Sequence, residues 1–252
     1  MSKTAKITVI SLAIATVLAI TAIIYAIGFV KIDDTLNIDN SSALLAETPD
    51  YGQHYINSTV FLGDFTVYGM YDEGVFDDAS ISTQVWSGTD GNLALDFNTY
   101  KATVKIPSSG EEMTLAEALS SYAPQYITVT VGRVNALEYC NKEAFVSYYQ
   151  KLVNTIKESS PQTKIILQSI LPVTAKYQRK NQQCSNSKID VCNTWICEVA
   201  ESEGIKFLNT ASLFKDSSGN LMADYASSDG SRLNRNGYLK MFEYMRTHGY
   251  TD

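Results

Sequence analysis

Residues 60–70 have the sequence Val-Phe-Leu-Gly-Asp-Phe-Thr-Val-Tyr-Gly-Met. The apolar run that begins at Val60 is typical of a strand buried on both faces of a parallel sheet. Gly63 and Asp64 end this run abruptly, so Phe65 would lie at the carboxyl edge of the strand. In open α/β sheets, that edge is where ligands bind. We therefore expect a functional site around Asp64 and Phe65.

The rest of the chain alternates segments typical of strands and of helices. The expected strands are Thr59–Leu62, Ala79–Trp86, Tyr126–Val131, Lys164–Leu171 and Ile205–Leu208, and the expected helices are Leu115–Ser121, Lys142–Ser159, Lys188–Glu203 and Asn236–Thr247. Lys101–Ile106, which precedes a Pro-Ser-Ser-Gly turn, is expected to form one arm of a surface hairpin. This alternation predicts an α/β fold, a three-layer α/β/α sandwich around a five-stranded parallel sheet.

The N-terminal segment is typical of a membrane anchor. Residues 7–30 contain no charged side chain, and a helix of that length can cross a hydrocarbon core of about 30 Å. Lys3 and Lys6 precede the run, which favours a cytoplasmic N-terminus. A cleaved signal peptide is the alternative, although its apolar region is usually about 7–15 residues. We expect an anchor in residues 1–30, a polar tether in 31–57 and an extracytoplasmic domain in 58–252, placing a single-pass protein at the cell membrane.

All four cysteines follow the expected anchor. An oxidising compartment favours disulfides, and no Cys-x-x-Cys pair supports a zinc site. Cys192 and Cys197 would share one helix, too far apart to bond to each other. Cys140 and Cys184 would lie in loops at the same sheet edge as Phe65, where a disulfide would brace the rim of the cleft. Buried free thiols are the alternative.

The net charge of −7 argues against a nucleic-acid partner, because nucleic-acid surfaces are usually basic. No sequence motif points to a cofactor, and we expect neither a cofactor nor a metal ion.

Several blocks resemble, in the right order, those of the SGNH/GDSL hydrolases. The blocks are Gly63–Phe65, Gln84–Gly88, Thr130–Asn135, Lys164–Val173 and Ser228–Asn234, the last followed by Gly237 and Tyr238. The resemblance covers about residues 60–248. It implies a flavodoxin-like (SGNH-type) sandwich on which the family carries an esterase site.

The chain departs from this family at the catalytic positions. Phe65 stands where the family has its nucleophilic serine, and Arg232 stands where it has the histidine base. Val134 occupies the position of the oxyanion asparagine, unless the loop has gained a residue and Asn135 takes that role. Phenylalanine has no nucleophilic heteroatom, and arginine stays protonated at physiological pH. Losing the nucleophile or the base of such a triad costs up to about six decades in turnover.

No other histidine is expected to replace the missing base. His54 precedes the first strand, and His248 lies near the end of the last helix. Both are expected on the surface, well away from Arg232. Ser87, Ser228 and Ser231 would lie near the cleft, but without a base they are ordinary hydroxyls.

The replacements also suggest a ligand cleft. The retained Asp229 is expected to form an ion pair with Arg232, and Arg133 is expected to lie opposite the retained Asp64. The candidate cleft residues are Asp64, Phe65, Tyr68, Trp86, Gly88, Arg133, Asn135, Asp229 and Arg232, with Tyr71 nearby. Two guanidinium groups beside aromatic rings suit a sugar or a carboxylated glycan. The alternative is a plugged, salt-bridged relic of the site.

Three functions are therefore open. The first is a catalytically degenerate ectodomain that binds an envelope glycan or another envelope protein. The second is an active carbohydrate O-acyl or acetyl esterase with a non-standard nucleophile, which requires a hydroxyl or thiol within hydrogen-bond reach of a base in the cleft. The third is a structural ectodomain that its anchor brings to a larger complex.

Overall fold

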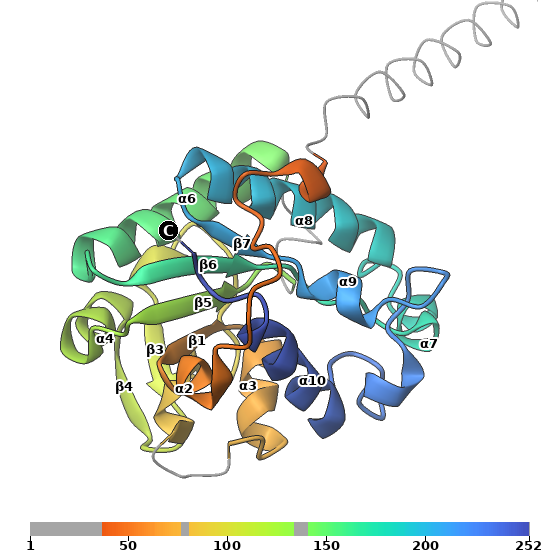
Figure 1. Ribbon diagram of the computed structural model, residues 1–252, viewed down its shortest axis with the longest axis horizontal. Helices are drawn as coiled ribbons and strands as arrows, with labels where there is room; N and C mark the ends of the chain where they lie inside the picture. The colour runs from red at the N-terminus through yellow and green to blue at the C-terminus, as the bar shows by residue number, and fades with distance from the viewer. Residues whose placement is uncertain (1–36, 77–80, 134–140, 252) are drawn as a thin grey trace, which may run out of the picture. The chain divides into compact units, whose positions relative to one another are not determined.

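The computed structural model describes residues 37–76, 81–133 and 141–251. In these ranges seven strands form one sheet in the order β4-β3-β2-β1-β5-β6-β7 (Figure 1). The strands are β1 (Thr59–Gly63), β2 (Val85–Gly88), β3 (Thr103–Ile106), β4 (Glu111–Thr114), β5 (Tyr126–Thr130), β6 (Lys164–Gln168) and β7 (Lys206–Leu208).

The α/β sandwich is confirmed, but the expected count of five strands is wrong. Strands β1, β2, β5, β6 and β7 pair in parallel as predicted. The hairpin predicted from Lys101–Ile106 does not lie apart on the surface. Its strand β3 pairs antiparallel with both β2 and β4 and so widens the sheet. The sequence of β4, Glu-Glu-Met-Thr, lacks the apolar alternation that marks a strand, which is why the pattern did not reveal it.

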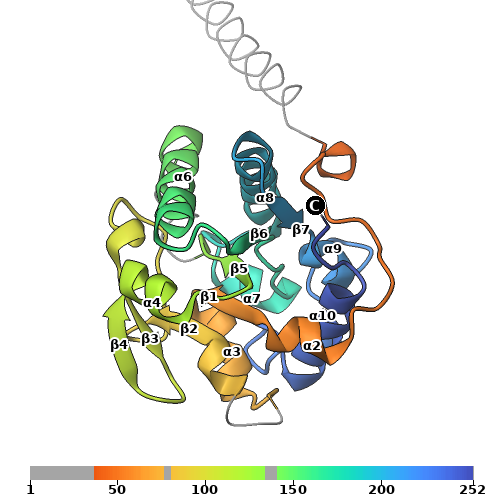
Figure 2. The same ribbon diagram turned by 60° about the vertical axis from the view of Figure 1, so that its left-hand side comes forward.

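Helices cover both faces of the sheet (Figure 2). On one face α6 (Lys142–Ser159) packs between α4 (Leu115–Tyr122) and α8 (Asn186–Ser202). On the other face lie α2 (Gly52–Asn57), α3 (Phe65–Asp72) and α10 (Arg235–Arg246). The remaining short elements are α7 (Ala175–Lys180), α9 (Thr210–Phe214), η1 (Ile38–Asn40), η2 (Ile81–Gln84), η3 (Thr99–Lys101) and η4 (Ala223–Tyr225).

Local signals explain most helix ends. Asn141 caps α6, because its side chain accepts a hydrogen bond from the Ala144 N–H at 2.9 Å. Thr114 and Glu117 form a capping box at the start of α4. The second strand begins later than predicted, at Val85, because the residues before it form the 3₁₀ turn η2.

The sheet core is apolar on both faces. All five residues of β1 are buried, and Phe61 packs with the ring of Phe242 from α10 at a centroid distance of 5.5 Å. Because β1 lies near the middle of the sheet with apolar contacts on both sides, its carboxyl end is held rigidly.

Part of the segment expected to be a loose tether packs closely on the domain. The Leu45 N–H donates to the Phe207 carbonyl at 2.9 Å, and the Phe207 N–H donates to the Ala43 carbonyl at 2.8 Å. Both Ala43 and Leu45 are buried. This stretch therefore continues the hydrogen-bonded ladder beyond β7.

The expected anchor in residues 7–30 lies outside the described residues. Across the ranges that the structure describes, no helix is both long enough and apolar enough to span a bilayer.

Candidate functional site

The carboxyl end of β1 is a tight turn that Asp64 stabilises. Gly63 has no room for a side chain, because a Cβ there would lie 2.2 Å from the Thr130 carbonyl oxygen. The Asp64 carboxylate accepts hydrogen bonds from the Thr66 N–H at 2.9 Å and from the Thr66 hydroxyl at 2.7 Å. Asp64 is thus the N-cap of α3.

Asp64 is almost fully enclosed, with 2 % of its surface exposed. Burial raises the pKa of this carboxyl above its ordinary value. Hydrogen bonds from Thr66 lower this pKa, and so do the charge and the backbone N–H of Arg133. Their combined effect is smaller than that of burial. The expected closeness of Arg133 and Asp64 is therefore present.

The guanidinium group of Arg133 packs over the ring of Phe65. The guanidinium carbon is 5.1 Å from the Phe65 ring centroid and 5.9 Å from that of Tyr177. The Arg133 side chain is buried, its Nη2 donates to the Ser231 carbonyl oxygen, and its Nη1 has no hydrogen-bond partner. This arginine links the end of β5 to the loop before α10 and fills the space above the half-buried Phe65.

The prediction of an ion pair between Arg232 and Asp229 is wrong. Arg232 Nη1 instead contacts Asp72 Oδ2, at the end of α3, at 2.8 Å. Burial would lower the pKa of Arg232, but the hydrogen bond and charge of Asp72 raise it overall. Residues three apart in sequence point in different directions here because they belong to a tight loop rather than to a helix.

Asp229 closes its own loop. Its carboxylate accepts hydrogen bonds from the Ser227 hydroxyl at 2.7 Å, from the Ser231 N–H at 2.9 Å and from the Ser231 hydroxyl at 2.8 Å. Burial alone would raise the pKa of Asp229, but these hydrogen bonds, helped by the charge of Arg232, lower it. The loop thus contains a hydroxyl–carboxylate pair, Ser231 with Asp229.

Residues 61–240 match the family model described as GDSL-like Lipase/Acylhydrolase family. The chain belongs to this family. The family resemblance inferred from the ordered blocks is therefore confirmed.

Solved structures of similar fold support this assignment. A protein from Streptococcus pneumonia named for platelet activating factor has a TM-score of 0.51 at 17% identity, covering 77% of this chain and 88% of that one. A protein from Bacteroides fragilis named as an acylhydrolase has a TM-score of 0.52 at 15% identity, covering 80% and 88%. At these identities the likeness is one of fold. No curated protein matches the chain in sequence.

The positions that the family resemblance assigns to the catalytic residues lie in part within the described residues. Phe65 is the first residue of α3 and Arg232 lies in the loop before α10, with Arg133 between Phe65 and Ser231. Val134 and Asn135, the two alternatives for the oxyanion asparagine, lie outside the described residues.

A pocket of about 480 Å³ opens beside Phe65. Its lining residues are Phe65, Arg133, Tyr177, Lys180, Asn181, Gln182, Gln183 and Cys184. Sequence reasoning identified Phe65, Arg133 and Cys184 but missed the polar residues of α7 and the turn after it. One feature of the sequence could have identified these residues: they lie in the connection after β6, which begins at the same carboxyl edge of the sheet as Phe65.

Of the aromatic residues expected in the cleft, Phe65 lines this pocket and the others do not. Trp86 is fully buried in β2, where its ring packs edge-on against Tyr122 of α4 at a centroid distance of 5.5 Å. Tyr68 and Tyr71 lie on α3 with centroids 5.9 Å apart, and neither lines the pocket beside Phe65. The prediction for Trp86 is wrong because alternate residues of a strand point to opposite faces.

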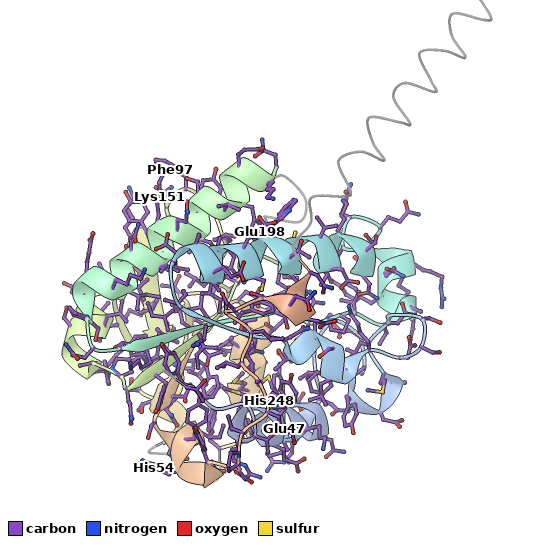
Figure 3. The ribbon with its side chains drawn as sticks, turned by 45° about the horizontal axis from the view of Figure 1, so that its top comes forward. Glu47, His54, Phe97, Lys151, Glu198 and His248 are labelled. Atoms are coloured by element: carbon purple, nitrogen blue, oxygen red, sulfur yellow. The ribbon has the colours of Figure 1, made fainter. Side chains whose placement is uncertain are left out.

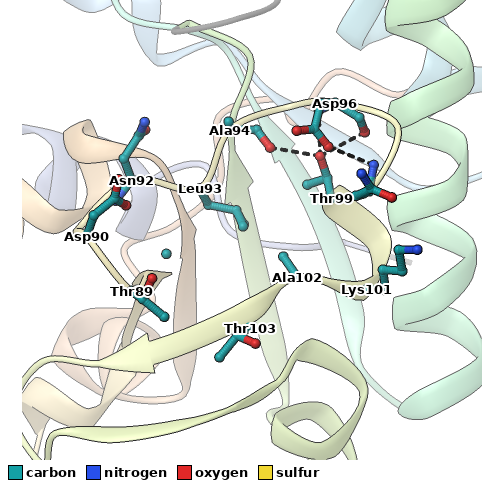
Figure 4. A pocket seen from close by; sticks show the side chains of 12 residues that line it. Thr89, Asp90, Asn92, Leu93, Ala94, Asp96, Thr99, Lys101, Ala102 and Thr103 are labelled. Carbon is teal, nitrogen blue, oxygen red and sulfur yellow. Dashed lines mark hydrogen bonds between the residues drawn. The ribbon is translucent and has the colours of Figure 1, made fainter.

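Gly88 lines a different pocket, of about 530 Å³, beside β2 and η3 (Figure 4). Polar groups there mostly serve the loop itself. The Thr99 hydroxyl donates to the Ala94 carbonyl at 2.8 Å and accepts from the Asp96 N–H at 2.6 Å. A Cβ on Gly88 would lie 2.1 Å from the Asn92 carbonyl oxygen, so this glycine permits a close backbone approach.

Neither of the two histidines of the chain, which are labelled in Figure 3, lines the pocket beside Phe65. His54 is exposed on α2, which precedes β1. His248 stacks on Tyr244 at a centroid distance of 3.8 Å and contacts the Tyr244 carbonyl through Nδ1 at 3.0 Å.

The expected disulfide between Cys140 and Cys184 is wrong, because Cys184 carries a free, half-buried thiol. Cys140 itself lies outside the described residues. Cys192 and Cys197 both lie on α8, as expected. Burial raises the pKa of the free thiol of Cys197 to about 11. An even cysteine count in an oxidising compartment favoured disulfides but carried no information on the distance between thiols.

No metal site stands out in the described ranges, where no three His, Cys, Asp or Glu side chains form a group able to hold an ion.

Proposed function

We propose that this GDSL-like chain is a catalytically inactive family member that binds a ligand at the cell envelope. The observation that carries the proposal is the contact between Arg133 and Phe65. A phenyl ring stands at the nucleophile position, and a permanently charged, buried guanidinium covers it at 5.1 Å. Neither group can attack an acyl carbon or accept a proton.

The retained carboxylates are consistent with this proposal, because they have other partners. Asp64 caps α3, and Asp229 holds its own loop. With Arg232 at the histidine position and bonded to Asp72, Asp229 has no imidazole to orient.

An active esterase with a non-standard nucleophile is the second candidate. It is favoured by the 2.8 Å contact between the Ser231 hydroxyl and the Asp229 carboxylate. However, hydrogen bonding lowers the pKa of Asp229, whereas an efficient general base has a pKa near the working pH. The pair therefore suits a loop brace better than a catalytic dyad.

An ester-hydrolysis assay separates these two functions. The full chain, purified in detergent, would be incubated with p-nitrophenyl acetate and with an O-acetylated sugar. We expect the wild-type rate to equal that of a Ser231→Ala variant and that of heat-denatured protein. A wild-type rate well above both would overturn the proposal and assign the activity to Ser231.

The envelope location rests on the uncharged stretch 7–30 and on the two lysines before it. An alkaline phosphatase fused to the C-terminus in a bacterial host would test it. We expect phosphatase activity that sediments with membranes, and activity lost when residues 7–30 are deleted. Activity in a soluble, N-terminally shortened product would favour a cleaved signal peptide instead.

A third possibility is a structural ectodomain in a larger complex. Such a domain needs no open pocket, whereas a ligand-binding domain does. The pocket beside Phe65 is not filled by Phe65 and Arg133, and this favours ligand binding.

A further inference from the structure

Arg133 lines the pocket beside Phe65 and carries an unused hydrogen-bond donor. Its side chain is 4 % exposed, and its buried Nη1 has no hydrogen-bond partner. Leaving a buried donor unsatisfied costs about 1–3 kcal/mol, and more for a charged group. Native structures satisfy nearly all such groups, so each exception needs an explanation. A bound acceptor in the pocket would supply the missing partner.

The pocket lining is cationic although the whole chain is acidic. The net charge of the protein is −7, yet the described residues that line this pocket include Arg133 and Lys180 and no acidic residue. The pocket beside η3, by contrast, includes Asp90 and Asp96. An anion is thus the complementary ligand for the pocket beside Phe65.

Two carboxylates close to the pocket favour a ligand with one negative charge over a ligand with two. Asp64 faces Arg133 from the end of β1, and Asp229 lies close enough to influence Tyr177. These carboxylates limit the positive potential that Arg133 and Lys180 create. Moreover, Nη2 of Arg133 is already engaged with Ser231, so a ligand meets one free nitrogen rather than the whole guanidinium fork. A carboxylate fits this arrangement better than a phosphate dianion.

The other walls suit a sugar ring. Phe65 and Tyr177 supply aromatic surface, and the exposed side chains of Asn181, Gln182 and Gln183 supply amide donors and acceptors for hydroxyl groups. The volume of about 480 Å³ lies within the usual range of small-molecule sites, about 300–1,000 Å³.

We propose that this pocket binds a sugar acid, with Arg133 Nη1 and Lys180 holding its carboxylate while Phe65, Tyr177 and the amides contact the ring. This inference names the ligand class of the proposed binding function and rests on that function.

Calorimetry with four small probes tests the ligand class. The full chain in detergent, at low ionic strength, would be titrated with glucuronate, glucose, acetate and inorganic phosphate. We expect glucuronate to bind at least about tenfold more tightly than glucose or acetate, since each of those lacks one half of the recognised chemistry. Glucose binding as tightly as glucuronate would overturn the proposal, and so would phosphate binding more tightly.

Matched variants test the two cations. Arg133→Gln should weaken glucuronate binding at least about tenfold, and Lys180→Gln should weaken it by a few-fold, because Lys180 is exposed and screened. Lys176→Gln is the control, since Lys176 is exposed on the same helix but does not line the pocket. If Arg133→Gln fails to fold, the comparison of Lys180→Gln with Lys176→Gln decides. Equal affinities in those two variants would overturn the proposal.

Thiol protection gives a readout that needs no variant. The free Cys184 lines the pocket, whereas the free Cys197 is buried in α8. Saturating glucuronate should slow alkylation of Cys184 several-fold, as mapped by peptide mass spectrometry, and leave the rate at Cys197 unchanged. An unchanged rate at Cys184 would contradict binding in this pocket.

The same preparations distinguish failure of the proposed inactivity from failure of the proposed sugar-acid site. Ester hydrolysis by the wild-type chain would overturn the proposed inactivity whatever binds. Absence of both hydrolysis and glucuronate binding would overturn the sugar-acid site alone.

Discussion

The loop after β1 and the loop before α10 both keep an aspartate, yet the two aspartates are in different surroundings. Asp64 is buried and caps α3, whereas Asp229 is exposed and braces a turn. Their pKa values shift in opposite directions, since burial dominates at Asp64 and hydrogen bonds dominate at Asp229. The comparison teaches that both carboxylates hold the backbone of their own turns through hydrogen bonds, although one is buried and the other exposed.

The largest effect should come from restoring chemistry on both loops. Phe65→Ser with Arg232→His would place a hydroxyl on the first loop and an imidazole on the second, near Asp229. We expect acetyl-ester hydrolysis at least about 10²-fold above the wild-type background, and a further rise when Arg133→Ala clears the space above residue 65. The activity should stay far below that of an active hydrolase of this family, because Val134 supplies no side-chain donor for the oxyanion.

Each single variant, Phe65→Ser or Arg232→His, serves as the control and should remain inert, because each lacks half of the catalytic unit. A wild-type chain as active as the double variant would show that these two positions do not explain the inactivity.

Next in size is the effect of each aspartate on stability. Asp64→Ala should lower the free energy of unfolding by about 2 kcal/mol, because it removes a cap and leaves Thr66 with buried donors. Asp229→Ala should cost less than about 1 kcal/mol, since water can replace the exposed carboxylate. Urea unfolding measures both, and equal losses would contradict the difference between the loops.

The two loops should also respond oppositely to pH. A raised carboxyl pKa in the folded state means that Asp64 stabilises the fold most below its unfolded pKa of about 3.9, and that this contribution is lost as the pH rises through its folded pKa. Asp229, with its lowered pKa, stabilises the fold above about pH 3.9, and this contribution is lost as the pH falls through its folded pKa.

Urea unfolding of Asp64→Asn and Asp229→Asn between pH 3 and 8 checks the signs. In the wild-type protein, Asp64 should lower the free energy of unfolding as the pH rises, and Asp229 should lower it as the pH falls. Asp64→Asn should abolish the first effect, and Asp229→Asn should abolish the second. The same slope change in both variants would refute the assignment.

The smallest effect concerns the ion pair that replaced the expected Arg232–Asp229 contact. A double-mutant cycle with Arg232→Gln and Asp72→Asn should give a coupling of less than about 1 kcal/mol, because both side chains are partly exposed. The coupling should shrink further in 1 M salt. A coupling above about 2 kcal/mol would indicate that this pair organises the loop.

The sequence predicted those features that depend on local pattern. The apolar run ending at Gly63 determines structure within a few residues, and the buried parallel strand predicted from it is present. The pocket depended instead on tertiary placement. Lys180 lies in a polar stretch that carries no motif, and it matters because the connection after β6 folds back beside Phe65. The partner of Arg232 was missed for the same reason, since Asp72 is 160 residues away.

The closeness of residues 43–45 to β7 has a further consequence for the edges of the sheet. An unpaired sheet edge can recruit a strand from a neighbouring molecule and start aggregation. Here the β7 edge is covered by the stretch that includes the Leu44–Phe207 bridge, and the opposite edge is β4, which carries Glu111 and Glu112. One edge is thus occupied by the chain itself, and the other carries charged side chains, which disfavour pairing with a strand of a second molecule.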